Sequence, residues 1–310
     1  PIAAAPVPFV LSSSLDSLFV QASTAPQKFQ AMVQPARDSI VSKSEAIEFL
    51  ARYLGSAFPR ERLAMEYLMP KLYAKDTARV VALINDSLYS VNSSTVQFCL
   101  WLVGKCSIKT LAKPLQSLLQ HPDWRIRAAV AYNIGEGMFV DLAPKCVPLL
   151  KDSVSHVRMR AAYTLARLSP ASVITTLKPS LNDPLQLVRN AVGMGLRAAK
   201  PLSVQLLSSA FDSHLLSHAR HALVKALPAL DTNSNRDSVG TMILTLEPDE
   251  REAAYRVLLL ESSDFWHTVL DQCRRKEVDS SLRLLIGPPP PSSASSAPAK
   301  SPSGSKNAKT

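Results

Sequence analysis

Apolar side chains follow a helical period along most of the chain. Between residues 44 and 286 they recur at spacings of three, four and seven, and short polar breaks separate the helical stretches. One such break, His121-Pro122-Asp123, ends a helix with proline and caps the next helix with aspartate. No stretch alternates regularly between apolar and polar residues. The pattern therefore predicts an all-α protein with essentially no β-sheet.

A short motif repeats within this helical region. Arginines followed by small residues stand at Arg127, Arg160, Arg189 and Arg220, at intervals that are similar but not equal. Self-similarity at such intervals is typical of stacked units, each of which buries its apolar face against its neighbours. We therefore predict an α-solenoid of about seven helix pairs over residues 44–286, in which each second helix begins near the arginine.

The segment Arg127-x-x-Val130-Ala131-x-x-Ile134-Gly135 resembles the HEAT repeat. This resemblance implies a binding scaffold whose concave face is lined by second helices and holds a protein partner. It also implies a structural ladder in which the four arginines bond aspartates between neighbouring turns. A fifth copy has Glu252 where the arginine is expected, which puts the ladder contact of that unit in doubt.

The two ends of the chain differ in composition from the helical region. Residues 1–43 carry several prolines among short apolar pieces, so we predict an extended N-terminal arm that is ordered on a partner or on the solenoid. Residues 287–310 hold prolines, serines and three lysines without an acidic residue. We expect this segment to be a flexible basic tail, because it has few large apolar side chains to bury.

Within the HEAT superfamily, the chain resembles structural subunits of organelles, specifically the peripheral stalk of green-algal mitochondrial ATP synthase. The features behind this resemblance are the basic charge, the Ala/Ser/Pro-rich ends and a start at Pro1, which suggests processing or engineering. The resemblance implies other protein subunits as partners and a place on the matrix side of the inner membrane. The longest apolar run, around Val96–Val103, is too short to cross a bilayer, so membrane contact would be peripheral.

Nucleic acid is the alternative partner. The chain has a formal net charge of +10, and some HEAT-like proteins are DNA glycosylases. Asp123 and Trp124, with Arg125 and Arg127, could serve as a catalytic acid next to a base-stacking aromatic ring. However, three of the positive charges lie in the tail and the others are scattered, which makes nucleic acid the less favoured partner.

Two further groups of residues are candidate sites. His214, His218 and His221 can share one helix face and offer imidazoles to a metal, although packing or exposure explains them more simply. Arg274, Arg275 and Lys276 close a strong helix and could dock an acidic partner or anionic lipid, although the helix dipole alone favours cations there.

The sequence lacks the usual motifs of enzymes. It contains no His-Glu pair of the kind that builds the iron site of HEAT-like deoxyhypusine hydroxylase. It also has no H-E-x-x-H, phosphate-binding loop or G-x-S-x-G motif. The four cysteines do not cluster, which favours packing roles in a reducing compartment. We therefore expect a non-enzymatic scaffold with no catalytic residue, cofactor or metal.

Overall fold

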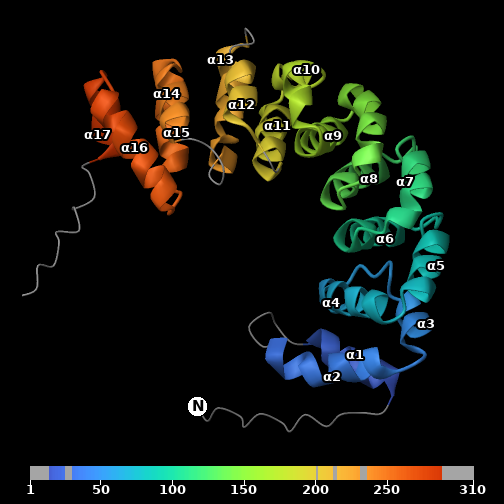
Figure 1. Ribbon diagram of the computed structural model, residues 1–310. Coiled ribbons are helices and arrows are strands. Elements are labelled where there is room, and N and C mark those ends of the chain that lie inside the picture. The colour runs from blue at the N-terminus through green and yellow to red at the C-terminus, as the bar shows by residue number, and fades with distance from the viewer. Residues whose placement is uncertain (1–13, 25–29, 200–201, 212–214, 231–235, 288–310) are drawn as a thin grey trace, which may run out of the picture. The chain divides into compact units, whose positions relative to one another are not determined.

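The computed structural model describes residues 14–24, 30–199, 202–211, 215–230 and 236–287, and these residues form helices and connecting loops without any β-strand (Figure 1). The prediction of an all-α solenoid is confirmed. The chain divides into two compact units, the first up to Asn235 and the second from Arg236. The predicted solenoid over residues 44–286 therefore spans both units.

Among its described residues, the first unit contains helices α1–α13 and four 3-10 helices. Their bounds are α1 Leu15–Thr24, α2 Gln30–Ser42, α3 Ala46–Ala51, α4 Pro59–Lys75, α5 Thr77–Ser87, α6 Ser93–Cys106, η2 Lys109–Leu111, α7 Ala112–Leu118, α8 Trp124–Glu136, η3 Val140–Lys151, α9 Ser155–Leu168, η4 Pro170–Ile174, α10 Lys178–Leu181, α11 Gln186–Ala198, α12 Val204–Phe211, α13 Ser217–Val224 and η5 Leu227–Leu230.

The second helices of the pairs start at a constant interval in the first unit. Helices α6, α8, α9, α11 and α13 begin at Ser93, Trp124, Ser155, Gln186 and Ser217, and the step from each start to the next is the same. In the second unit, α15 begins at Pro248 and α17 at Ser280. The repeat therefore has a regular period, and the unequal spacings of the predicted arginine motif do not follow it.

Two rows of helices make up most of the first unit. The second helices contact one another in succession, α6 with α8, α8 with α9, α9 with α11 and α11 with α13. The first helices form the other row, and Figure 1 shows α5 and α7 beside α6 and α8. In this row η3 is a 3-10 helix that holds Pro144 and Pro148, whose missing amide hydrogens disfavour a regular α-helix.

Small residues let neighbouring second helices approach closely. A Cβ atom on Gly193 of α11 would lie 1.9 Å from the backbone oxygen of Ala222 in α13. A Cβ on Gly135 of α8 would lie 2.6 Å from Oγ1 of Thr164 in α9, and this buried hydroxyl donates a hydrogen bond to the carbonyl of Ala131. Any side chain at Gly193 would therefore force two helices apart.

The prediction of an extended N-terminal arm is wrong for the described residues of that segment. Residues 15–24 and 30–42 form α1 and α2, which contact each other and α4. Leu18, Phe19 and Ala22 are buried at helical spacing, and the Phe19 ring packs on Phe49 and Tyr53. The prolines obscured this helical pattern in the sequence. Residues 1–13 and the tail at 288–310 lie outside the described residues.

The second unit contains α14 Arg236–Leu244, α15 Pro248–Leu258, α16 Asp264–Lys276 and α17 Ser280–Ile286. Helix α14 packs on α16, and α15 packs on α17. Trp266 and Tyr255 are among the largest fully buried side chains and belong to this unit. Gly287 ends α17 with a positive φ of 80°, a conformation that glycine adopts without a steric penalty.

Candidate functional site

The predicted arginine ladder exists and begins at Arg127. Its guanidinium donates hydrogen bonds of 2.8 and 3.0 Å to the two carboxylate oxygens of Asp152, at the corner before the next second helix. It also donates to the backbone carbonyls of His121 and Pro122, at the corner before its own helix. One side chain thus joins two successive corners of the solenoid.

The residue that repeats this contact is Arg158, so the assignment of Arg160 to the ladder is wrong. Arg158 donates from Nε to Asp183 at 2.8 Å and from Nη1 to the carbonyls of Asp152 and Ser153. Arg158 follows Arg127 by the same step that separates the starts of their helices, whereas Arg160 is out of register with it.

Arg189 and Arg220 occupy the same position in the next two repeats. Nη1 of Arg189 donates to the carbonyls of Asp183 and Pro184, at 2.7 and 2.9 Å, as the ladder geometry requires. The sequence position that corresponds to its acidic partner holds His214, which lies outside the described residues together with the predicted corner residue Asp212. Arg220 follows Arg189 by the same step by which Arg189 follows Arg158.

The ladder continues in the second unit, contrary to the doubt that Glu252 raised. Arg251 donates from Nε and Nη2 to Glu277, at 3.0 and 3.2 Å, and from Nη1 to the carbonyl of Leu246. The hydroxyl of Tyr255 donates a further hydrogen bond of 2.7 Å to Glu277. Glu252 itself pairs with Arg256 on the surface of α15. The ladder residue is therefore Arg251, one position before the glutamate.

The ladder carboxylates are held in the anionic form. Burial opposes the ionisation of Asp152, but hydrogen bonds from Arg127 and from the amide of Val154 outweigh it and lower its pKa. Burial likewise opposes the ionisation of Glu277, but the hydroxyl of Tyr255 and the Arg251 guanidinium keep its pKa low. Groups with these pKa values accept hydrogen bonds and do not serve as general acids near neutral pH.

Asp123 and Trp124 form a structural corner. One carboxylate oxygen of Asp123 accepts a hydrogen bond of 2.9 Å from the amide of Arg125, and the other accepts one from the hydroxyl of Ser93. These contacts cap α8, and the hydrogen bond from the backbone amide of Arg125 is the main cause of the low pKa of Asp123. The Trp124 ring packs against His156 of the next repeat, with centroids 5.7 Å apart.

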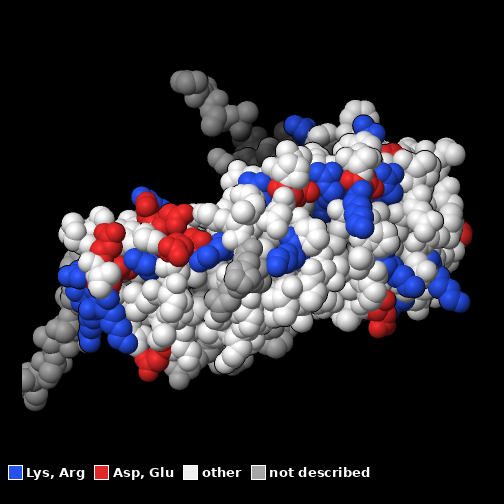
Figure 2. Space-filling model, turned by 90° about the horizontal axis from the view of Figure 1, so that it is seen from above, with Lys and Arg blue, Asp and Glu red and all other residues white. Residues whose placement is uncertain are grey.

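The basic cluster at the end of α16 is partly neutralised. Arg274 and Arg275 both pair with Asp271, at 2.7 and 2.6 Å, within one turn of the same helix. Arg275 remains largely exposed. Figure 2 shows the same mixture more widely, because Lys and Arg are interspersed with Asp and Glu on the face it draws. Docking of an acidic partner by Arg274, Arg275 and Lys276 stays a prediction.

The histidines and cysteines have ordinary environments where the structure describes them. Nδ1 of His221 lies 2.9 Å from the carbonyl of Ser217, one turn earlier in α13. No group of three possible metal ligands occurs among the described residues. Burial raises the pKa of the Cys99 and Cys146 thiols to about 12, so both are protonated side chains of the core.

Arg160 belongs to an aromatic cluster on the second-helix row. Its guanidinium lies 4.2 Å from the centroid of the Tyr132 ring, which packs on the ring of Tyr163 with centroids 5.7 Å apart. The Tyr163 hydroxyl donates to Glu136, and Arg167 pairs with the same carboxylate. These side chains join α8 to α9, and no pattern in the sequence indicates that they form a cluster.

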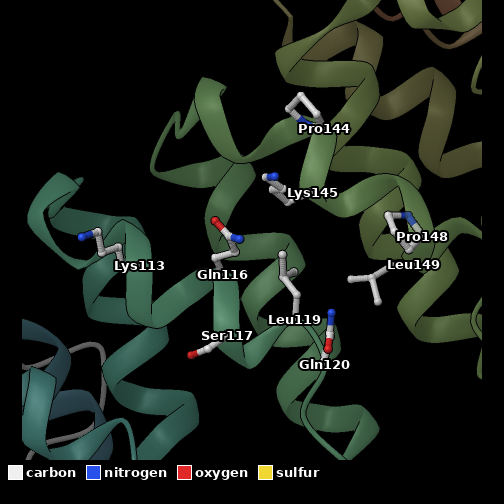
Figure 3. A pocket seen from close by; sticks show the side chains of 9 residues that line it. All are labelled: Lys113, Gln116, Ser117, Leu119, Gln120, Pro144, Lys145, Pro148 and Leu149. Atoms are coloured by element: carbon white, nitrogen blue, oxygen red, sulfur yellow. The ribbon is translucent and has the colours of Figure 1, made fainter.

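A groove lies between α7 and η3, in the first-helix row (Figure 3). Its volume is 780 Å³, and its floor includes the buried side chains of Leu119 and Leu149. Figure 3 shows Lys145 of η3 and Gln116 of α7 facing each other across it. The remaining lining residues are Lys113, Ser117, Gln120, Pro144 and Pro148. No pattern in the sequence indicates this groove, because it depends on how two first helices pack.

The comparisons with known proteins bear on the same region. The family model of HEAT repeats matches residues 111–197, which include the groove, the tyrosine cluster and the first ladder contacts. Residues 111–197 are HEAT repeats. The HEAT-repeat resemblance is therefore confirmed, and the chain has the helical repeat scaffold that proteins of this kind use to bind other proteins.

An engineered protein solved by the Northeast Structural Genomics Consortium is similar at 15% sequence identity, with 84% of this chain and 77% of that chain covered and a TM-score of 0.40. The comparison with curated proteins gives no match. Among the described residues, none of the helices combines the length and hydropathy that a membrane span requires.

Proposed function

We propose that this HEAT-repeat chain is a non-enzymatic scaffold subunit of a larger protein assembly. The observation that carries this proposal is a row of apolar residues at the corners of the first unit. An apolar residue precedes three of the second helices: Val154 before α9, Leu185 before α11 and Leu216 before α13. The corners before α6 and α8 instead hold the polar residues Asn92 and Asp123. These corner residues recur at the constant step of the repeat.

The corner leucines face solvent. The exposed fraction is 43% for Leu185 and 59% for Leu216, and Leu187, two residues after Leu185, is also exposed. Polar caps are preferred at helix N-termini, so leucines at these positions gain nothing for the isolated helices. Exposed apolar residues that recur along one edge are typical of a protein-binding surface. A partner that lies along this edge would cover them.

The charged groups support a role without catalysis. Asp123 caps a helix, and the ladder carboxylates bind arginines of neighbouring repeats. As the specific assembly we propose the peripheral stalk of mitochondrial ATP synthase, on the matrix side of the inner membrane, because the composition of the chain resembles subunits of that stalk. Its partners would then be other stalk proteins.

Purification from a native extract tests this proposal. The tagged chain is isolated, and co-purifying proteins are identified by mass spectrometry. We expect a defined set of protein partners, including inner-membrane ATP synthase subunits if the specific version holds. Recovery of the chain alone would contradict the scaffold role.

A pair of variants tests the corner leucines. L185E/L216E places charges on the corner edge, and we expect it to lose partners that the wild-type chain retains. The matched control is Y89E/V91E, which introduces the same charges at exposed apolar residues next to α5 and α6. Loss of partners in both variants, or in neither, would show that the corner leucines have no specific role in partner binding.

A further inference from the structure

We propose that the groove between α7 and η3 binds an acidic, partly apolar segment of a partner protein in an extended conformation. This inference rests on the proposed scaffold function and specifies the chemistry of one partner segment. The groove lies on the first-helix row, whereas the corner leucines lie at the N-termini of second helices.

The charge of the groove determines the sign of the ligand. Lys113 of α7 and Lys145 of η3 line it, both are exposed, and no acidic residue is among the lining residues. Neither lysine makes an ion pair or a hydrogen bond within the described part of the chain. Two lysines without acidic partners favour carboxylates on the bound segment.

The floor of the groove determines what lies between those carboxylates. Leu119 and Leu149 are buried at its base, and the exposed rings of Pro144 and Pro148 also line it. An apolar side chain that enters the groove would cover these groups and lose its own contact with water. The exposed amides of Gln116 and Gln120 can both donate and accept hydrogen bonds, as an extended backbone requires.

The lining does not suit a nucleic acid. None of the nine lining residues is aromatic, so the groove offers no ring on which a base could stack. Two lysines are also few for a phosphate backbone, whose binding depends on many cationic contacts. The C-terminal tail of the chain does not suit it either, because residues 287–310 carry three lysines and no acid.

Random-peptide display on the full chain tests the proposal. Selections run in parallel on the wild-type chain, on the groove variant K113E/K145E and on the control K105E/K151E. The control makes the same change of net charge at exposed lysines that do not line the groove. All four positions are exposed, so the substitutions leave the core intact.

We expect the wild-type chain and the control to enrich peptides that combine Asp or Glu with an apolar residue. The labelled consensus peptide should bind the groove variant at least about tenfold more weakly in fluorescence anisotropy. Its binding to the wild-type chain should weaken between about 50 and 200 mM NaCl, since salt screens the lysines.

Several outcomes would overturn the proposal. These are the absence of enriched peptides, enrichment of neutral or basic peptides, and equal binding of the consensus peptide to the groove variant. A labelled single-stranded oligonucleotide is measured alongside. If it displaces the peptide and itself requires Lys113 and Lys145, the groove is a nucleic-acid site and the proposal fails.

The experiments distinguish a wrong groove proposal from a wrong scaffold proposal. A chain that is recovered alone from native extract contradicts the scaffold role itself. If the wild-type chain brings down partner proteins, K113E/K145E brings down the same proteins and no acidic peptide is selected, then the scaffold role stands and the groove proposal is wrong.

Discussion

The guanidinium of Arg127 and the carboxylate of Asp152 are joined by two hydrogen bonds across 25 residues of sequence. Because Arg127 also binds the backbone of the corner before its own helix, the pair sets the spacing between two successive corners. Arg158 and Asp183 repeat the contact one repeat later. The ladder thus determines how each repeat is placed on the next.

We predict that Arg127→Ala destabilises the protein by about 2 to 4 kcal/mol, measured by chemical denaturation. The Asp152 side chain is only 8% exposed, so removal of the arginine leaves a buried carboxylate without its charged partner. The matched control is Arg160→Ala, which removes the same side chain from the surface of Tyr132. We expect this control to cost less than about 1 kcal/mol. Equal losses in the two variants would show that Arg127 has no special role.

The ladder also predicts how stability depends on pH. The pKa values of Asp152 and Asp183 are below the ordinary aspartate value of 3.8, so the folded state holds fewer protons than the unfolded state as the pH approaches that value. Their contribution is therefore fully present above the unfolded pKa and is lost as the pH falls through the lower, folded pKa. We expect the free energy of unfolding to decrease between about pH 5 and pH 2.

The control for this pH dependence is the double variant D152N/D183N, which cannot titrate at these positions. It should be less stable than the wild-type chain near neutral pH, and the difference should shrink as the pH falls. A difference that stays constant across this range would contradict the assignment of the acid sensitivity to the ladder.

Gly193 gives a prediction about helix packing. Gly193→Ala should destabilise the protein by about 1 to 3 kcal/mol, because the new methyl group would overlap the backbone oxygen of Ala222. Gly240→Ala is the matched control, since its Cβ would meet the end of the flexible Gln272 side chain at 3.1 Å and Sγ of Cys273 at an ordinary contact distance of 3.9 Å. Alanine is a better helix former than glycine, so we expect this control to be neutral or stabilising by up to about 1 kcal/mol. Thermal unfolding of both variants measures the contrast.

The solenoid could be predicted from the sequence because apolar periodicity and self-similarity remain recognisable even when the repeats are aligned a few residues out of register. It misassigned Arg160, because the run Arg160-Ala161-Ala162 copies the local pattern after Arg127 while its side chain points to another surface. A constant step was available as a signal, since the step from Arg127 to Arg158 equals the step from Asp152 to Asp183. Local similarity of residues is therefore a weaker guide to register than equal spacing of both partners of a contact.

Other features could not be predicted from the sequence for physical reasons. The helices at residues 15–42 depend on burial of Leu18 and Phe19 against later helices, and that long-range contact outweighs the prolines nearby. The groove depends on the packing of η3 against α7, which no local pattern encodes. Tertiary contacts decided both cases.

The last prediction separates a scaffold from a reader of nucleic acid. Because Asp123 caps α8 through its carboxylate, and asparagine caps helices as well as aspartate, Asp123→Asn should leave stability nearly unchanged. Asp123→Ala should cost about 1 kcal/mol, because it removes the cap.

DNA binding by the wild-type chain should be weak and should disappear between about 50 and 200 mM salt, as expected for contacts with scattered cations alone. Fluorescence anisotropy with duplex DNA, together with a base-excision assay on alkylated duplex, measures both properties. Tight binding that persists at high salt and is lost in Trp124→Ala, with excision activity lost in Asp123→Asn, would show that this corner is a catalytic site and would overturn the structural role assigned to it.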